Sequence, residues 1–382
     1  MKNILKKIRR LAPALLSFGG LAAVCVLSVM ALRRIETSAF AAMLSFGLGW
    51  YLGLFGQIIA HEAGHMVGGL ISGYRFCSFR IGSFILVKDE NGFKLGRFRL
   101  AGTGGQCLMA PPELKDGGIP TTLYNVSGVL ANLFVSAVCA LVYAFAWDSP
   151  VGVAFAVVGL MGIYLALTNG IPLNTGVVDN DGRNAVSMAK DRTAQRAFWL
   201  QLKVNELSSK GMRVKDMPEE WFVRPNHQEM KNPITAAVGV LCCARLMDEL
   251  RFDEANVLMR RYLAMKSGLN GIHRAALVCD RIFLELIGEN RPVVVEKLLT
   301  KQQKKLMKML RTQLSVQRTE YALKLIYEND AEAAAKVLAM FDKTAKDYPY
   351  KQDVDSEREL IALADRKYSE ITSEAEEKTD GE

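Results

Sequence analysis

Two histidines and a glutamate stand at the end of a long uncharged segment. They are His61, Glu62 and His65, in an HExxH arrangement, and residues 38–60 before them carry no charged side chain. On a helix this spacing places both imidazoles on one face, one turn apart, with the carboxylate beside them. Such a pair suits a zinc ion, and the carboxylate can move protons to and from a bound water. Because ionisable groups are costly within a bilayer, the motif predicts a hydrolytic metal centre at membrane depth.

A third protein ligand is needed, since two histidines leave a catalytic zinc site incomplete. The other two histidines, His227 and His273, lie in the polar second half of the chain, where we expect them to be structural. Two aspartates, Asp179 and Asp181, follow the last apolar run and stand after Pro172. Proline ends a helix and leaves the backbone free to fold towards a metal. Either aspartate therefore qualifies as the third ligand.

The depth of the helices supports this combination. A helix rises about 1.5 Å per residue, so one that starts near residue 40 has crossed the hydrocarbon core by His61. A helix that starts near residue 151 has crossed it by Asn169. We therefore expect the histidines and the acidic segment to reach the same, cytoplasmic level.

The elements that must position these groups are apolar helices in the first half of the chain. The sequence has 382 residues, half of them hydrophobic, and four uncharged runs long enough to span a bilayer. These spans are expected at about 11–32, 40–66, 122–147 and 151–170. The net charge of +8 comes from segments that flank the runs, which is typical of cytoplasmic loops. No nucleic-acid-binding motif is present, so no nucleic-acid partner is expected.

Residues 1–37 are predicted to hold a retained transmembrane helix rather than a cleaved signal peptide. The run is longer than a signal-peptide core, and Arg33-Arg34 follows it in place of a small-residue cleavage site. A basic N-terminus is expected in the cytoplasm. Four spans then place both termini on that side of a multi-pass cell-membrane protein.

A β-hairpin is predicted at about residues 75–101, in the loop between the second and third spans. Two extended segments flank an Asn-Gly pair at Asn91-Gly92, which is a strong hairpin signal. The hairpin is either an ordinary surface feature or an edge that pairs with an extended peptide. A flexible glycine-rich loop, 102–106, is expected after it.

Residues 186–368 are predicted to form a soluble cytoplasmic domain of helical repeats. Three polar turns, near residues 250–255, 287–291 and 327–333, each lie between apolar helices and are spaced about 38 residues apart. The pattern resembles a degenerate tetratricopeptide-type repeat, which would bind a protein partner. The tail, 369–382, is acidic and is expected to be disordered. The predicted fold class is therefore mainly α: a four-span core, an inserted hairpin and a soluble helical domain.

The membrane part resembles the site-2 protease family of intramembrane zinc metalloproteases. The resemblance rests on HExxH in one transmembrane helix and on Asn169-Gly170-Ile171-Pro172 with a later Asp-Gly in another. It covers residues 38–185, the protease core, and favours Asp181 over Asp179 because only Asp181 precedes glycine. The chain departs from the family in one respect: Asp181 stands nine residues after the proline, where the family usually has only a few.

The resemblance implies a reaction and two further site residues. It implies one zinc ion per chain, with Glu62 as general base and acid in peptide-bond hydrolysis. Gly128 to Asn132 looks like the family's central-helix glycine–asparagine motif. Asn132 or Asn169 is expected to bind the oxyanion or the substrate backbone, or else to make a helix–helix hydrogen bond. The substrates implied are single-span membrane proteins or signal-peptide remnants, cleaved near the cytoplasmic face after unwinding.

Two other functions are compatible with parts of the sequence. A non-proteolytic membrane scaffold would use the helical repeats to bind a partner, but it gives Glu62 no role. A transporter would also place ionisable groups within the membrane, although four spans without a repeated half disfavour it.

Overall fold

The computed structural model describes residues 12–89, 92–98, 103–173 and 179–380. The chain forms two compact units. The first combines Met1–Ile81 with Gly104–Arg196, and the second combines Gly82–Thr103 with Ala197–Glu382. Helices make up most of the described residues, together with four short antiparallel strands.

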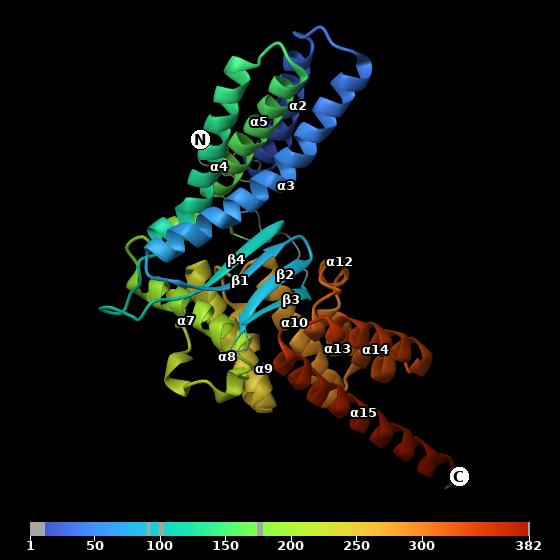
Figure 1. The fold of residues 1–382 in the computed structure, drawn as a ribbon. Coiled ribbons are helices and arrows are strands. Elements are labelled where there is room, and N and C mark those ends of the chain that lie inside the picture. Colours follow the sequence, from blue (N-terminus) through green and yellow to red (C-terminus); the bar gives the residue numbers. More distant parts are fainter. Residues whose placement is uncertain (1–11, 90–91, 99–102, 174–178, 381–382) are drawn as a thin grey trace, which may run out of the picture. The chain divides into compact units, whose positions relative to one another are not determined.

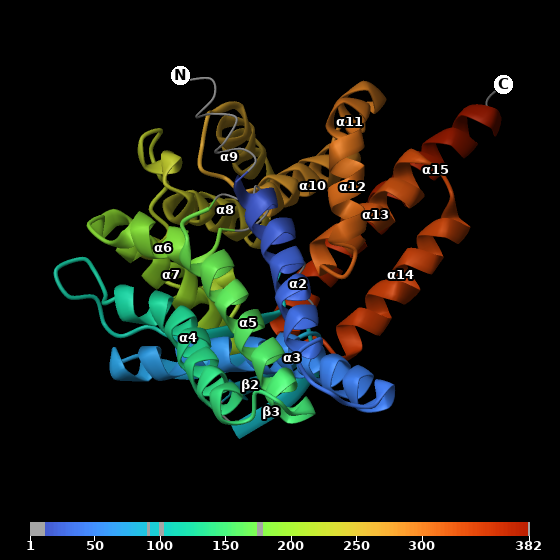
Figure 2. The ribbon, with the colours of Figure 1, turned by 90° about the horizontal axis from the view of Figure 1, so that it is seen from above.

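Four helices of the first unit are long and apolar enough to cross a membrane, as the sequence predicts. They cover Ala12–Leu32, Ala39–Ile71, Thr122–Phe145 and Pro150–Gly170. The first contains a π-helical segment, Leu15–Gly19, followed by α2 (Gly20–Leu32), and the others are α3, α4 and α5 in order. Figures 1 and 2 show them as a bundle in which α5 lies between α2 and α4. The second helix runs beyond the predicted end near residue 66, so the HExxH motif lies well inside it.

Small and polar side chains form the inner face of this bundle. The buried positions of α3 recur every fourth residue from Ser45 to Gly69, and both histidines belong to this series. In α4 the same spacing relates Tyr124, Gly128, Asn132 and Ser136. Large apolar side chains of these helices are exposed, Phe40 and Phe134 among them. This inside-out pattern is typical of helices that pack closely in lipid.

The break after α5 occurs where Pro172 predicts it. The helix ends at Gly170, and Ile171, which precedes the proline, is extended. After residues 174–178, which lie outside the described part, α6 (Asp181–Met188) and α7 (Arg192–Ser209) follow. The acidic segment therefore begins a new helix close in sequence to the end of α5.

Two of the strands belong to the first unit. β1 (Arg75–Ile81) pairs with β4 (Gly105–Ala110) in antiparallel register, with an irregularity between Phe76 and Ser78. The sequence predicts a flexible loop over 102–106, but its last two residues begin β4. Pairing with β1 stabilises this segment as a strand.

The other two strands form a hairpin in the second unit. β2 (Phe84–Asp89) pairs with β3 (Gly92–Arg97), and Asp89 lies opposite Gly92, at the Asn-Gly signal. The extended segment predicted before the Asn-Gly pair is divided between β1 and β2 by Gly82, whose φ of +60° favours glycine. At one end of β3, Arg97 N–H donates to the Asp347 carbonyl at 3.2 Å, so part of that edge is already paired within the unit.

The rest of the second unit consists of helices and short helical turns. The helices are α8 (Pro233–Asp248), α9 (Phe252–Ala264), α10 (Gly271–Ile287), α11 (Pro292–Leu298), α12 (Lys301–Met309), α13 (Leu314–Ala322), α14 (Ala331–Lys346) and α15 (Lys351–Asp380). Short 3-10 turns occur at Val214–Asp216, Glu219–Trp221 and Glu229–Lys231, and a π-helical segment at Leu323–Tyr327.

The three turns identified in the sequence share one backbone feature. Each contains a residue with positive φ: Leu250 at 58°, Asn290 at 50° and Asn329 at 50°. A left-handed residue of this kind ends one helix and lets the next turn back on it. The repeated turn geometry supports helix pairs, and the tetratricopeptide resemblance stays a prediction. Helix α15 extends through residues 369–380, where the sequence predicts a disordered tail; several strong helix formers there favour the helical backbone.

Two glutamates of α15 have pKa values shifted in opposite directions. Burial raises the pKa of Glu357 above its ordinary value, although Arg318 lies within 3.4 Å and opposes the shift. A hydrogen bond with Arg213 lowers the pKa of Glu359, which is half exposed. Glu357 therefore binds its proton more tightly in the folded state, and Glu359 less tightly.

The two shifts predict opposite pH dependences. The stability that comes from Glu357 is present below the pKa of an unfolded glutamate, roughly 4.3, and is lost as pH rises through the higher folded value. Glu357→Gln should therefore raise the Tm relative to wild type by more at pH 8 than at pH 5. Glu359→Gln is the matched control, because it should lower the relative Tm more at pH 8. Thermal unfolding of the detergent-purified full chain at both pH values measures this, and equal behaviour of the two variants would contradict it.

Candidate metal centre

His61 and His65 meet at their Nε2 atoms on the inner face of α3. The two atoms are 3.1 Å apart, and both residues are only 8% exposed. One helical turn separates the residues, as the HExxH spacing requires. Burying two imidazole rings in an apolar bundle costs free energy unless their nitrogen atoms find hydrogen-bond partners or a metal ion.

Asp181 completes a group of three ligand atoms. Its Oδ2 lies 2.9 Å from His61 Nε2 and 3.4 Å from His65 Nε2. All three atoms lie within 4.8 Å of one another, so the group could hold a metal ion. Burial favours a higher pKa for Asp181, but hydrogen bonds from the two histidines, which their Nε2 atoms donate only when the rings are protonated, outweigh it and hold the pKa below its ordinary value. The side chain is therefore a carboxylate, which is the form that binds a metal.

The hydrogen bonds of the histidines fix which ring nitrogen carries the proton. His65 Nδ1 lies 2.7 Å from the Tyr124 carbonyl, which can only accept. His61 Nδ1 lies 2.7 Å from Asn132 Oδ1. The amide orientation of Asn132 is set by its Nδ2, which donates to the backbone carbonyl of Gln57 at 2.8 Å and to its Oε1 at 2.9 Å. Both Nδ1 atoms must therefore donate, so the neutral imidazoles direct Nε2 lone pairs at each other and at Asp181.

This convergence requires a positive charge. Two lone pairs and a carboxylate oxygen at 2.9–3.4 Å repel one another in a site of low dielectric. A single proton satisfies one donor–acceptor pair, whereas a metal ion accepts a lone pair from all three groups at once. The donor set therefore suits a bound cation better than it suits the free side chains.

Asn180 and Gly182 hold Asp181 against α3. The Asn180 side chain donates to the carbonyls of Thr168 and Ile171 and accepts from Arg183 N–H, which caps α6 and joins it to the end of α5. A Cβ on Gly182 would lie 2.0 Å from the Gly170 carbonyl oxygen. Only glycine permits this approach, which explains why the ligating aspartate is followed by glycine.

Gly128 lets α4 approach the imidazoles. A Cβ at this position would lie 2.6 Å from His65 Nε2 and 2.7 Å from His61 Cε1. Gly64, which precedes His65, packs in a similar way: a Cβ added to it would lie 2.4 Å from the Ser127 carbonyl oxygen. The glycine of the Gly128 to Asn132 motif therefore makes room for the two rings, and the asparagine supports one of them.

Glu62 lies beside this group but is not one of the three ligands. It is 8% exposed, and an added Cβ on Gly105 of β4 would touch its Oε1 at 2.6 Å. The Gly105 carbonyl accepts a hydrogen bond from Arg80, which is 1% exposed. Within the described residues no hydrogen bond occupies the Glu62 carboxylate, so it is free to exchange protons with a water or a substrate.

Tyr124 links the strand pair to the metal ligands. Its carbonyl accepts from His65, and its hydroxyl donates to the Cys107 carbonyl of β4 at 2.8 Å. Its ring stacks on Tyr74 at 4.9 Å between centroids. Tyr124, in the first turn of α4, therefore holds both His65 and strand β4 in place.

The other residues singled out in the sequence lie elsewhere or act differently. Asp179 pairs with Arg183 at 2.7 Å and is not in the metal-binding group. Asn169 donates to the Leu165 carbonyl of its own helix at 3.1 Å, so this bond is not the helix–helix hydrogen bond that we considered for it. His227 and His273 belong to the second unit. Asn132 makes the helix–helix hydrogen bond that we considered for it, to Gln57 of α3, and its Oδ1 lies 2.7 Å from His61 Nδ1; its oxyanion role stays a prediction.

Sequence reasoning missed three supporting residues: Gln57, Tyr124 and Asn180. Gln57 is fully buried and donates to the Val158 carbonyl of α5 at 3.1 Å, so it joins three helices around Asn132. The sequence did contain a clue to Gln57, because it is a polar residue one helical turn before His61 on an otherwise apolar helix. Tyr124 acts through its backbone carbonyl, which no sequence pattern specifies.

Comparison with known proteins adds no family assignment. No family model, no curated protein and no solved structure matches the chain. The geometry of the site is therefore the basis for a functional conclusion.

The two aspartates make a matched pair for testing the ligand set. Asp181→Ala should reduce the bound metal from about one ion per chain to near zero, because two imidazoles alone hold it weakly. Asp179→Ala should retain the metal, since its carboxylate pairs with Arg183. Metal analysis of the detergent-purified protein measures both. Metal retained in the first variant and lost in the second would reverse the assignment.

The two asparagines test the support for His61. Asn132→Leu removes the acceptor of the His61 Nδ1 proton and should weaken metal affinity by about 10- to 100-fold. Asn169→Leu should leave the affinity unchanged, since its amide bonds only to its own helix. Competition with a chromogenic chelator measures the affinity, and equal losses in both variants would exclude a specific role for Asn132.

Proposed function

We propose that this chain is an intramembrane zinc endopeptidase of the site-2 protease type. One observation carries the proposal: two histidines and an aspartate converge inside a bundle of apolar helices, with an unoccupied glutamate carboxylate next to them. A structural metal site would have no use for that glutamate. The described geometry thus provides a metal-binding group and a separate proton acceptor.

Zinc fits this donor set. Two imidazole nitrogens and one carboxylate oxygen are ordinary zinc ligands, and three protein ligands leave a position open for water or substrate. Tetrahedral zinc with ligand bonds of about 2.0–2.1 Å has ligand atoms roughly 3.4 Å apart. The observed separations of 2.9, 3.1 and 3.4 Å are close to that value. The hydrogen bonds that both Nδ1 atoms donate would keep the Nε2 lone pairs directed at a bound ion.

The chain's own residues then supply proton transfer and orientation. When bound, zinc lowers the pKa of water and polarises a carbonyl group. Glu62 accepts a proton from the attacking water while the water oxygen bonds to the peptide carbon. Glu62 then delivers that proton to the leaving amine as the C–N bond breaks. The neighbouring Gly105 leaves no side chain between β4 and the glutamate. His61 and His65 are held by Asn132 and the Tyr124 carbonyl throughout.

The surroundings of the site favour a membrane-protein substrate. The two histidines of the metal-binding group lie on a helix long and apolar enough to span a bilayer, packed against two more. A single-span substrate must unwind before hydrolysis, because the peptide groups of a helix are hydrogen-bonded internally. The helical second unit would recruit or regulate substrates, because stacked helix pairs present extended binding surfaces.

Glu62→Gln separates chemistry from metal binding. The variant should keep its metal, since Glu62 is not a ligand, but cleavage should fall by about 100- to 10,000-fold. Membranes from cells that produce wild type or variant can be compared by mass spectrometry of new protein termini. Termini within apolar single-span segments should appear only with wild type. Glu254→Gln, on the second unit, is a control that should cleave normally, and full activity of Glu62→Gln would end the proposal.

A further inference from the structure

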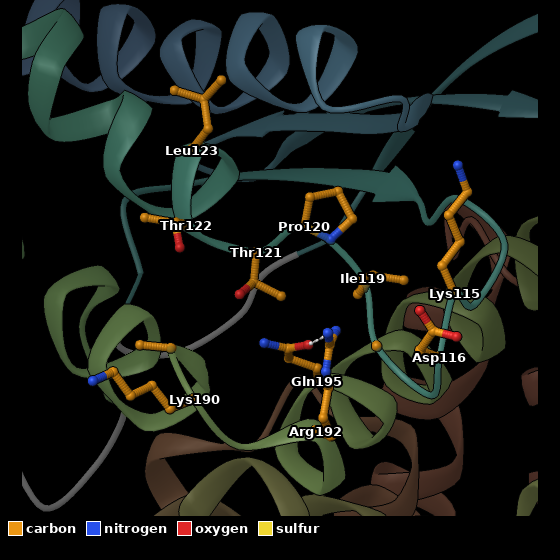
Figure 3. Close-up of a pocket in the computed structure, with 12 residues that line it drawn as sticks. Lys115, Asp116, Ile119, Pro120, Thr121, Thr122, Leu123, Lys190, Arg192 and Gln195 are labelled. Carbon is orange, nitrogen blue, oxygen red and sulfur yellow. Dashed lines mark hydrogen bonds between the residues drawn. The ribbon is translucent and has the colours of Figure 1, made fainter.

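A cavity of about 690 Å³ lies in the first unit, between the chain that enters α4 and the link from α6 to α7. Thr121, Gln195 and Ile119 are buried residues of its lining. Charged side chains lie around it, as Figure 3 shows. The metal-binding group does not line it, so it has no assigned role.

The rim of the cavity is basic. Lys115, Lys190 and Arg192 line it, against the single acidic side chain of Asp116. Arg192 Nη1 donates to Gln195 Oε1 at 3.1 Å, a neutral acceptor, as Figure 3 shows. In the described part of the chain none of the three cations is paired with a carboxylate. Unneutralised cations around a concave surface attract an anion.

The floor offers a hydroxyl without a partner. Thr121 is 3% exposed and lines the cavity, and its side chain makes no hydrogen bond with any described residue. A hydroxyl group that opens onto a cavity and has no protein partner is available to accept a hydrogen bond from a ligand there, or to donate one to it. Gln195 does not hydrogen-bond to the Thr121 hydroxyl, since its amide instead donates to the Met188 carbonyl and accepts from Arg192.

The first turn of α4 adds further donors. Thr122 and Leu123 also line the cavity and are the first residues of a 24-residue helix. The first backbone N–H groups of a helix have no acceptor within it, and they carry the positive end of the helix dipole. Backbone donors, the Thr121 hydroxyl and the Arg192 guanidinium beside Gln195 suit the oxygens of a phosphate group, and Lys115 and Lys190 add positive charge from opposite sides of the rim (Figure 3).

We propose that this cavity binds a phosphate group. It lies at the end of a candidate membrane span, next to Tyr124, and this is the level at which lipid headgroups occur. Ile119, Pro120 and Leu123 give the cavity an apolar side, which suits the glycerol and acyl portion of an anionic phospholipid. Free phosphate has the same oxygen chemistry, so the test has to separate the two sources. The proposal does not depend on the protease activity.

Native mass spectrometry of the detergent-purified full chain tests the lipid source. Phosphatidic acid should bind the wild type about tenfold or more tightly than phosphatidylcholine, which has no net charge. Lys190→Gln with Arg192→Gln should remove this preference. The matched control is Lys304→Gln with Lys305→Gln, which removes two exposed charges from α12 and should preserve it.

Inorganic phosphate tests the free source. Stabilisation of wild type in a thermal shift experiment, with no lipid preference and no response in the Lys190/Arg192 variant, would assign the cavity to free phosphate. The proposal is overturned if wild type shows neither response, or if the double variant and its control behave alike.

Two milder substitutions keep the test informative if the double variant does not fold. Asp116→Asn should tighten binding of phosphatidic acid, because it removes the only acidic side chain of the lining. Thr121→Val should weaken it by several-fold while preserving side-chain volume. Both should retain the metal, which separates this result from any failure at the metal centre; unchanged binding in both variants would count against the cavity.

Discussion

Mutual repulsion between His61, His65 and Asp181 is the constraint on which the first unit depends. Their ligand atoms lie within 4.8 Å of one another in a buried place, and the Nδ1 hydrogen bonds direct the lone pairs inwards. Without a cation such an arrangement is unfavourable, because charge and lone pairs are poorly screened there. Much of the surrounding structure prevents the three groups from moving apart.

The helices hold the three ligand groups together because small and polar residues form the inner face of the bundle. Repeated small positions on α3 and α4 let the helices approach until Gly128 touches the imidazoles. The same closeness brings Gln57 and Asn132 within hydrogen-bond distance of each other. In lipid the apolar side chains gain nothing by moving inwards, so packing and hydrogen bonds determine which face turns inward.

The cavity at the start of α4 and the metal-binding group share one structural neighbour. Tyr124 follows Thr121–Leu123 of the cavity, and its carbonyl holds His65. A ligand that orders the first turn of α4 would therefore also order the support of a metal ligand. The strand pair β1–β4 contributes to the same region through the hydrogen bond from Tyr124 to Cys107.

The sequence alone determined the apolar helices, the HExxH face, the helix end before Pro172 and the hairpin turn, because each depends on local spacing or backbone chemistry. It left Asp179 and Asp181 as alternatives on physical grounds, and it left Asn132 with either an oxyanion role or a helix–helix hydrogen bond. Only the tertiary structure decided these points. Asn180 caps α6 and Gly182 fits against Gly170, so Asp181 alone turns towards the histidines. Asn132 is occupied by Gln57 and His61, which lie in another helix. Contacts between helices depend on which faces meet, and that choice depends on the whole bundle rather than on any one segment.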